Sequence, residues 1–169
     1  VINAGAADSA PLWLRNTAIA PDGSRIAFTY KGDIDTVPVA GGEARRLTSS
    51  TTYETKPVWS PDGRRIAFAS DINGNFDVFS TAVDGSDAQW RRHTFNSTDE
   101  TPQAFTPDGK EIIYSAAVQA PAQSAAFPTR RLPQLYAVPS DKVLAPRLYT
   151  PVPALELAWA PDGKSFLYQ

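Results

Sequence analysis

Cysteine and methionine are absent from the 169 residues of the chain, and histidine occurs once, at His93. Without cysteine, the chain can form no disulfide framework, no thiolate nucleophile and no cysteine-ligated zinc or iron–sulfur site. Any Ser-His-Asp machinery would have to use His93. No apolar run approaches the roughly 18 residues that a membrane-spanning helix needs, so we expect no membrane span.

A strong charge of one sign is also missing, because 16 Lys and Arg stand against 18 Asp and Glu, for a net charge of -2. No global attraction to nucleic acid or to an anionic membrane follows. Arginine pairs occur at 45–46, 91–92 and 130–131, among aromatic residues. Two of the pairs hold equivalent positions in a sequence repeat, so we interpret them as a solvated strand face and expect no nucleic-acid partner.

Proline is abundant, with 15 residues, and this disfavours long helices. The tripeptide Pro-Asp-Gly begins at Pro21, Pro61, Pro107 and Pro161, with offsets of 40, 46 and 54 residues. Proline presets φ for a turn, aspartate can hydrogen-bond the backbone, and glycine takes the left-handed conformation. Each copy therefore predicts a tight β-hairpin, and the period is typical of a repeat architecture.

Strand spacing surrounds every Pro-Asp-Gly turn. Two positions before the proline stands a large apolar residue that we expect in one core layer: Ile19, Trp59, Phe105 and Trp159. Three and five positions after the glycine stand Ile26 and Phe28, Ile66 and Phe68, Ile112 and Tyr114, and Phe166 and Tyr168. Further strands are predicted around 33–36, 77–80 and 134–137, and around 44–48, 90–94 and 147–150. Four short antiparallel strands in each repeat predict a propeller blade.

We therefore predict an all-β fold, a partial β-propeller of about three and a half four-stranded blades of WD-like repeats. It forms a single, incomplete domain over 1–169, with blades at about 12–55, 56–101, 102–154 and 155–169, the last one truncated. Closed propellers typically have four to eight blades, so we expect a longer parent protein. Open strand edges invite pairing, which predicts a homodimer that completes the ring, or an arc capped by the segment around 12–14.

Several segments carry a family resemblance. Residues 20–28 (APDGSRIAF) and 60–68 (SPDGRRIAF) resemble the repeat of TolB and of the propellers in Tricorn-type serine peptidases. Residues 11–14 (PLWL), 27–33 (AFTYKGD), 41–45 (GGEAR) and 73–77 (NGNFD) resemble the amino-terminal propeller of bacterial Tricorn-like peptidases. The resemblance implies a non-catalytic propeller that admits or positions peptide or protein, with the catalytic Ser and His in a carboxy-terminal domain outside this chain.

The same resemblance implies a periplasmic or otherwise extracytoplasmic location. The chain opens with small residues and no basic leader at 1–8, which fits a product trimmed after a signal peptide as well as it fits a recombinant chain. The alternative function is a stand-alone periplasmic TolB-like scaffold for protein interaction, with no enzyme attached. A sugar-directed propeller lyase resembles this repeat less, and the chain lacks the histidine cluster expected for its metal.

No residue pattern predicts catalysis, a metal site or a cofactor. His93 aligns with Leu47 and Leu148 in the repeat, so we interpret it as a packed structural histidine. No G-x-S-x-G, H-E-x-x-H or G-x-x-x-x-G-K-[ST] motif occurs. Residues 71–77 (DINGNFD) offer alternating oxygen side chains, but Gly74 is misplaced for a calcium loop, so a strand-connecting turn is predicted.

Asp35 departs from the repeat, because it places a carboxylate where the other blades have Phe79 and Tyr136. A position that escapes its structural rule is a candidate functional position. We expect Asp35 to contribute to a binding site, and the plainer alternative is an outward-facing drift of the sequence.

The connection between the second and third strands is a further departure, since it lengthens to 115–134 in the third blade. Its insertion at 116–133 contains Phe127, Arg130 and Arg131, which we predict to bind the partner. Connections of this length are usually binding loops or disordered segments. We expect them on the face that also carries the inter-blade connections, opposite the Pro-Asp-Gly turns.

Overall fold

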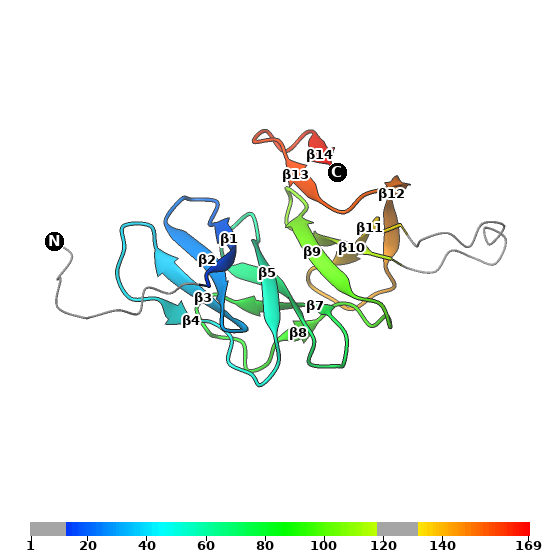
Figure 1. The fold of residues 1–169 in the computed structure, drawn as a ribbon. Helices are drawn as coiled ribbons and strands as arrows, with labels where there is room; N and C mark the ends of the chain where they lie inside the picture. The colour runs from blue at the N-terminus through cyan, green and yellow to red at the C-terminus, as the bar shows by residue number, and fades with distance from the viewer. Residues whose placement is uncertain (1–12, 118–131) are drawn as a thin grey trace.

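The computed structural model describes residues 13–117 and 132–169, in which every regular element is a β-strand (Figure 1). Within these two ranges, no helix is long and apolar enough to cross a membrane. The strands form three four-stranded antiparallel sheets and one two-stranded sheet, each in sequence order. The predicted partial β-propeller is confirmed.

The strand bounds show the same plan in each blade. Blade one holds β1 (Arg15–Ile19), β2 (Arg25–Tyr30), β3 (Asp33–Pro38) and β4 (Arg45–Arg46). Blade two holds β5 (Glu54–Trp59), β6 (Arg65–Ser70), β7 (Asp77–Ala82) and β8 (Arg91–Arg92). Blade three holds β9 (Glu100–Phe105), β10 (Glu111–Ala116), β11 (Gln134–Pro139) and β12 (Arg147–Pro153), and blade four holds β13 (Leu157–Trp159) and β14 (Phe166–Tyr168).

The first strands of successive blades lie next to one another through the middle of an open arc, in the order β1, β5, β9 and β13 (Figure 1). Each Pro-Asp-Gly turn follows the end of its first strand. Gly109 has φ +72°, and a Cβ there would lie 3.7 Å from Pro61 of the preceding turn. Glycine therefore serves both the turn conformation and the close approach of neighbouring turns. The opposite ends of these strands meet the connections between second and third strands, since the Glu54 and Glu100 amides donate to the Gly32 and Phe76 carbonyls.

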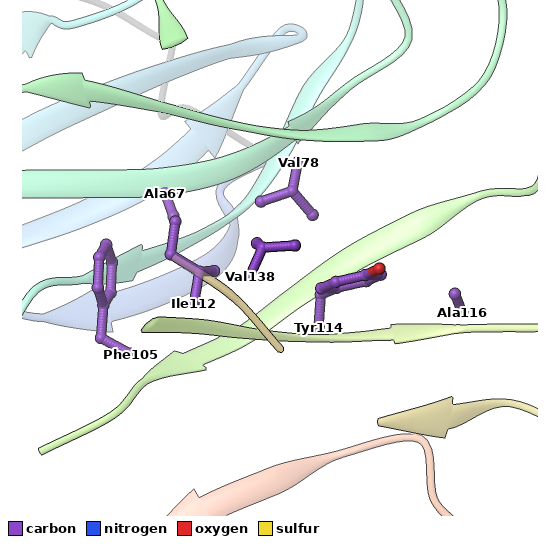
Figure 2. Packing of buried hydrophobic residues seen from close by; sticks show 7 residues of the cluster. All are labelled: Ala67, Val78, Phe105, Ile112, Tyr114, Ala116 and Val138. Atoms are coloured by element: carbon purple, nitrogen blue, oxygen red, sulfur yellow. The ribbon is translucent and has the colours of Figure 1, made fainter. Parts of the chain in front are cut away.

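The hydrophobic core lies between the blades. Figure 2 shows the cluster at the boundary of blades two and three, formed by Ala67, Val78, Phe105, Ile112, Tyr114, Ala116 and Val138. Similar clusters join blade one to blade two and blade three to blade four. Every blade therefore buries its apolar residues against its neighbours, as expected of a repeat protein.

The predicted core layer is correct for three of its four members. Phe105 is buried, and Trp59 and Trp159 are partly buried with their indoles across a blade boundary. The indole N–H of Trp59 donates to the carbonyl of Ala18 at 3.0 Å, and that of Trp159 donates to the carbonyl of Phe105 at 2.9 Å. The prediction is wrong for Ile19, which is 67% exposed, because no described blade packs on that side of blade one.

Candidate functional site

Asp35 lies in β3, opposite Phe28 of β2, and is only 6% exposed. The interpretation of Asp35 as an outward-facing drift is therefore wrong. The Arg46 guanidinium lies 3.9 Å from Asp35 and 3.1 Å from Asp33. Burial raises the pKa of Asp35, and the positive charge of Arg46 opposes that rise. Asp33 and Asp35 thus form a pair of buried carboxylates inside blade one, next to Arg46.

The other three predicted binding residues, Phe127, Arg130 and Arg131, lie outside the described residues. The connection that carries them leaves β10 at the buried Ala116 and enters β11 at Gln134. On its return side, the carbonyl of Pro133 accepts a hydrogen bond of 3.0 Å from the amide of Ala154. The return end is therefore anchored to the chain that leads into blade four.

The arginine pairs join neighbouring structural elements instead of forming only a solvated face. Arg92 pairs with the fully buried Asp77 at 2.7 Å, inside its own blade. Arg91 reaches blade three, where it donates to the carbonyl of Asp141 at 2.6 Å. Arg45 likewise donates to the carbonyl of Asp84 in blade two at 3.1 Å. The first arginine of each described pair contacts the next blade, and the second neutralises a carboxylate of its own blade.

A buried glutamate begins the first strand of blades two and three. Oε1 of Glu54 accepts hydrogen bonds from the hydroxyls of Ser50 at 2.8 Å, Thr52 at 2.9 Å and Ser70 at 3.1 Å. Strand pairing places Ser70 opposite Glu54, and it places Ala116 opposite Glu100. Glu100 therefore lacks one of the hydroxyl donors that Glu54 has.

The electrostatic consequence is a carboxyl group that titrates near neutrality. Burial, reinforced by the charge of Asp77, raises the pKa of Glu100 to about 7. The pKa of Glu54 is raised as well, but three hydroxyl donors oppose the effect of burial. Sequence reasoning missed these buried carboxyl groups. The signal that could have revealed them is that Asp33 and Glu54 recur one repeat later as Asp77 and Glu100.

A hollow of about 760 Å³ lies at the boundary of blades two and three. Its walls come from the start of β9, from β10 and β11, from the inter-blade connection and from the loop before β12: His93, Thr94, Phe95, Asn96, Ser97, Glu100, Tyr114, Tyr136, Val143, Leu144, Ala145 and Pro146. Phe95, Val143 and Leu144 are more than half exposed, so its mouth is apolar. A concave apolar site with a few buried polar groups is the usual form of a ligand pocket.

His93 is buried, with 1% of its surface exposed, as predicted for a packed residue. Its alignment with Leu148 is wrong by one residue. Strand pairing sets Arg92 opposite Phe79 and Leu148 opposite Tyr136, which makes Tyr149 the counterpart of His93.

The His93 ring also forms a hydrogen bond that no sequence motif announced, between Nε2 and the Ser80 hydroxyl at 2.9 Å. Both side chains are about 1% exposed, and burial lowers the pKa of His93 to about 4. Among the described residues, no carboxylate is hydrogen-bonded to the imidazole. The pair therefore lacks the orienting acid and the open access to substrate that a Ser-His nucleophile needs.

Over 13–117 and 132–169, no three His, Asp or Glu side chains come together in an arrangement that could hold a metal ion. The turn at Gly74 connects β6 and β7, with φ +97° at the glycine, in agreement with the strand-connecting turn that was predicted.

Comparison with known proteins places the fold in context. TolB of the Tol-Pal system of Bordetella pertussis is 44% identical over 48 residues, which are 28% of this chain and 11% of that protein. Tricorn protease homolog 1 of Streptomyces coelicolor is 33% identical over 81 residues, 48% of this chain and 7% of that protein. The chain thus spans about a tenth of the length of these relatives or less.

A TolB structure from Agrobacterium tumefaciens matches with a TM-score of 0.71 and 21% identity, covering 95% of this chain and 60% of that one. At this identity the match shows a shared fold. The model of the family described as the Tricorn protease N-terminal beta propeller domain matches residues 11–169. This match takes in all of the described blades, and the chain therefore belongs to the family of Tricorn protease N-terminal propeller domains.

Proposed function

We propose that this chain is a non-catalytic recognition domain of an extracytoplasmic Tricorn-like peptidase, where it binds peptide or protein and admits it to a catalytic domain elsewhere in the parent. The observation that carries the proposal is the hollow between blades two and three. Its apolar mouth, with Phe95, Val143 and Leu144 exposed, is the kind of surface that commonly marks an interaction site. Membership of a family of peptidase propellers supports peptide as the ligand.

The site chemistry supports recognition over catalysis. Ser80 and His93 are hydrogen-bonded but sealed from solvent, and the low pKa of His93 makes it a weak proton acceptor at neutral pH. The purified chain should therefore not hydrolyse casein or short chromogenic peptides. Turnover that persists after contaminating proteases are removed, and that Ser80→Ala abolishes, would refute the non-catalytic assignment.

A second candidate function is a stand-alone TolB-like scaffold for protein interaction. The fold match to TolB over 95% of this chain and the local identity to a Tol-Pal system protein favour it, and both support an extracytoplasmic location. The two candidates differ in the parent protein. A serine-peptidase segment in the full reading frame supports the first, and a propeller that ends without one supports the second.

Binding is tested directly with an immobilised peptide library. We expect the chain to retain a subset of peptides, and we expect Phe127→Ala, Arg130→Ala and Arg131→Ala to reduce retention, since these predicted residues lie on the connection next to β10. Asp35→Asn tests the fourth predicted residue. Lys164→Ala, at an exposed turn of blade four, is the matched control. Absence of any retained peptide from a folded chain would overturn the proposal.

A homodimer remains part of the proposal. Ile19 on blade one and Leu167 on blade four are strongly exposed apolar residues at the two ends of the arc. A second copy of the chain that covers both would bury them at one symmetric interface. Light scattering tests this, and a strict monomer at high micromolar concentration would contradict it.

A further inference from the structure

Blade two covers its own aromatic pair with a tryptophan. Phe68 of β6 and Phe79 of β7 are stacked, with ring centroids 6.2 Å apart and an interplanar angle of 19°. Trp90, just before β8, approaches both rings edge-on, at 5.2 Å and 90° to Phe68 and at 6.3 Å and 76° to Phe79. Edge-to-face contacts of this geometry are favourable beyond the apolar area that they bury.

Blade three has the same aromatic pair without the covering ring. Tyr114 of β10 and Tyr136 of β11 are opposite each other and stacked, at 5.8 Å and 27°. Arg147 pairs with Ala137 just as Arg91 pairs with Ser80, so the counterpart of Trp90 is Pro146. Proline is too small to reach over the tyrosines, and the hollow of about 760 Å³ lies there, with Pro146 in its wall.

The floor of the hollow supplies a buried hydrogen-bond acceptor. Glu100 lines it and is 2% exposed, and its Oε2 is buried with no hydrogen-bond partner among the described residues. The negative charge of the neighbouring Asp77 is already met by Arg92. A ligand that brings one neutral N–H or O–H donor would satisfy the unpartnered oxygen of Glu100.

We propose that this hollow binds the indole of a tryptophan presented by a partner peptide, with the ring edge-on to Tyr114 and Tyr136 and the indole N–H donated to Glu100. The bound indole would make with Tyr114 and Tyr136 the edge-to-face contacts that Trp90 makes with Phe68 and Phe79 in blade two. The proposal deepens the recognition function and rests on it only for the source of the tryptophan. Phenylalanine would fill the space but leave the buried acceptor unsatisfied, and leucine would lack the edge-to-face contact.

The test uses small probes, so that the site is measured separately from peptide recognition. N-acetyl-tryptophanamide is titrated into the chain and followed by ligand-observed saturation-transfer NMR, with N-acetyl-phenylalaninamide and N-acetyl-leucinamide as comparators. We expect saturable binding of the tryptophan probe, with about tenfold weaker binding of the phenylalanine probe. Absence of saturation, or equal binding of all three probes, would overturn the proposal.

Two variants test the role of the covering tryptophan, one by adding it to blade three and the other by removing it from blade two. Pro146→Trp should fill the hollow from within and lower probe affinity at least tenfold. Trp90→Ala should expose the Phe68–Phe79 pair and create a second probe site. Leu144→Glu, at the exposed mouth, provides a further variant that leaves the core untouched, and Lys164→Ala is the matched control. Unchanged probe binding by folded Pro146→Trp and Leu144→Glu would refute the site.

The outcomes separate this site from the wider function. If the probe binds but no tryptophan-containing peptide is retained from the library, the hollow stands and the recognition function fails. If peptides are retained but Pro146→Trp and Leu144→Glu change nothing, recognition stands and the hollow is not its site. Melting curves by circular dichroism establish that each variant is folded.

Discussion

Glu100→Gln should change how the stability of the chain depends on pH. Glutamine keeps the shape of the side chain and removes its titration. Burial raises the pKa of Glu100 to about 7 from an ordinary 4.5, so the folded chain favours the protonated acid. The stabilisation from this group is therefore fully present below about pH 4.5 and is lost as the pH rises through 7.

The magnitude follows from the two pKa values. Each tenfold difference in proton affinity is worth about 1.4 kcal/mol, so the full contribution of Glu100 at acid pH is about 3 kcal/mol. Between pH 5 and pH 7, the wild-type chain should lose about 2 kcal/mol of unfolding free energy relative to Glu100→Gln. Asp35, Glu54 and Asp77 also have raised pKa values, but they are present in both proteins, and the difference isolates the Asp77–Glu100 pair.

His93 opposes this trend in the wild-type chain. Burial lowers its pKa to about 4 from 6.5, so the folded chain favours the neutral ring, and its contribution is lost as the pH falls from about 6.5 to 4. The contributions of His93 and Glu100 therefore have opposite slopes between about pH 4.5 and 6.5. These two contributions should largely cancel in that window, and His93→Leu should expose the falling slope of Glu100.

Urea unfolding at pH 5, 6, 7 and 8, followed by tryptophan fluorescence, measures these differences. Glu156→Gln, at an exposed position before β13, is the matched control and should follow the wild type throughout. Parallel curves for Glu100→Gln and wild type between pH 5 and 7 would refute the reasoning, since Glu100 would then titrate as an ordinary glutamate.

Four further substitutions test the packing by the same unfolding assay. Arg92→Ala should cost about 3 kcal/mol because it leaves the fully buried Asp77 without its cation, whereas Arg46→Ala, which removes a half-exposed guanidinium, should cost less than about 1 kcal/mol; equal costs would contradict this. Trp59→Ala should cost about 3 kcal/mol through the cavity and the lost bond to Ala18, and a neutral result would place Trp59 outside the core. Gly63→Val should destabilise the second turn by about 1 to 3 kcal/mol because its φ is +68°, and no loss would contradict that backbone conformation.

The repeat made most of the fold predictable. Pro-Asp-Gly with strand spacing on both sides is a local signal, because turn chemistry and alternation act over a few residues. The exposure of Ile19 was not predictable in this way, since it depends on which blade packs against it and not on its position in the repeat. The burial of Asp35 was hidden for a similar reason, because it depends on Arg46 of the neighbouring strand, which lies 3.9 Å from the carboxylate.

The candidate site was less accessible to sequence reasoning than the fold. To recognise the hollow, one must know how β12 pairs with β11. The loop before β12 is longer than the loop before β4, so sequence alignment alone misplaces β12 by one residue. This error aligns His93 with Leu148 and conceals its true counterpart. With strand pairing known, Pro146 aligns with Trp90. The missing side chain then becomes visible as a difference between two repeats.

Equivalent boundaries in a repeat protein must be filled in similar ways, because each is stabilised mainly by its own contacts. Between blades one and two, Leu47 and Trp90 pack against the apolar cluster, and the Ser70 hydroxyl donates to Glu54. Between blades two and three, His93 replaces the leucine, and Pro146 and Ala116 are the counterparts of the tryptophan and the serine. All three changes fall at one boundary. Together they remove two apolar side chains and one hydroxyl donor, and they leave an unfilled volume lined by buried polar atoms. Such a combination lowers stability unless a ligand restores the contacts, which makes the hollow a better candidate for binding than a boundary with one isolated change.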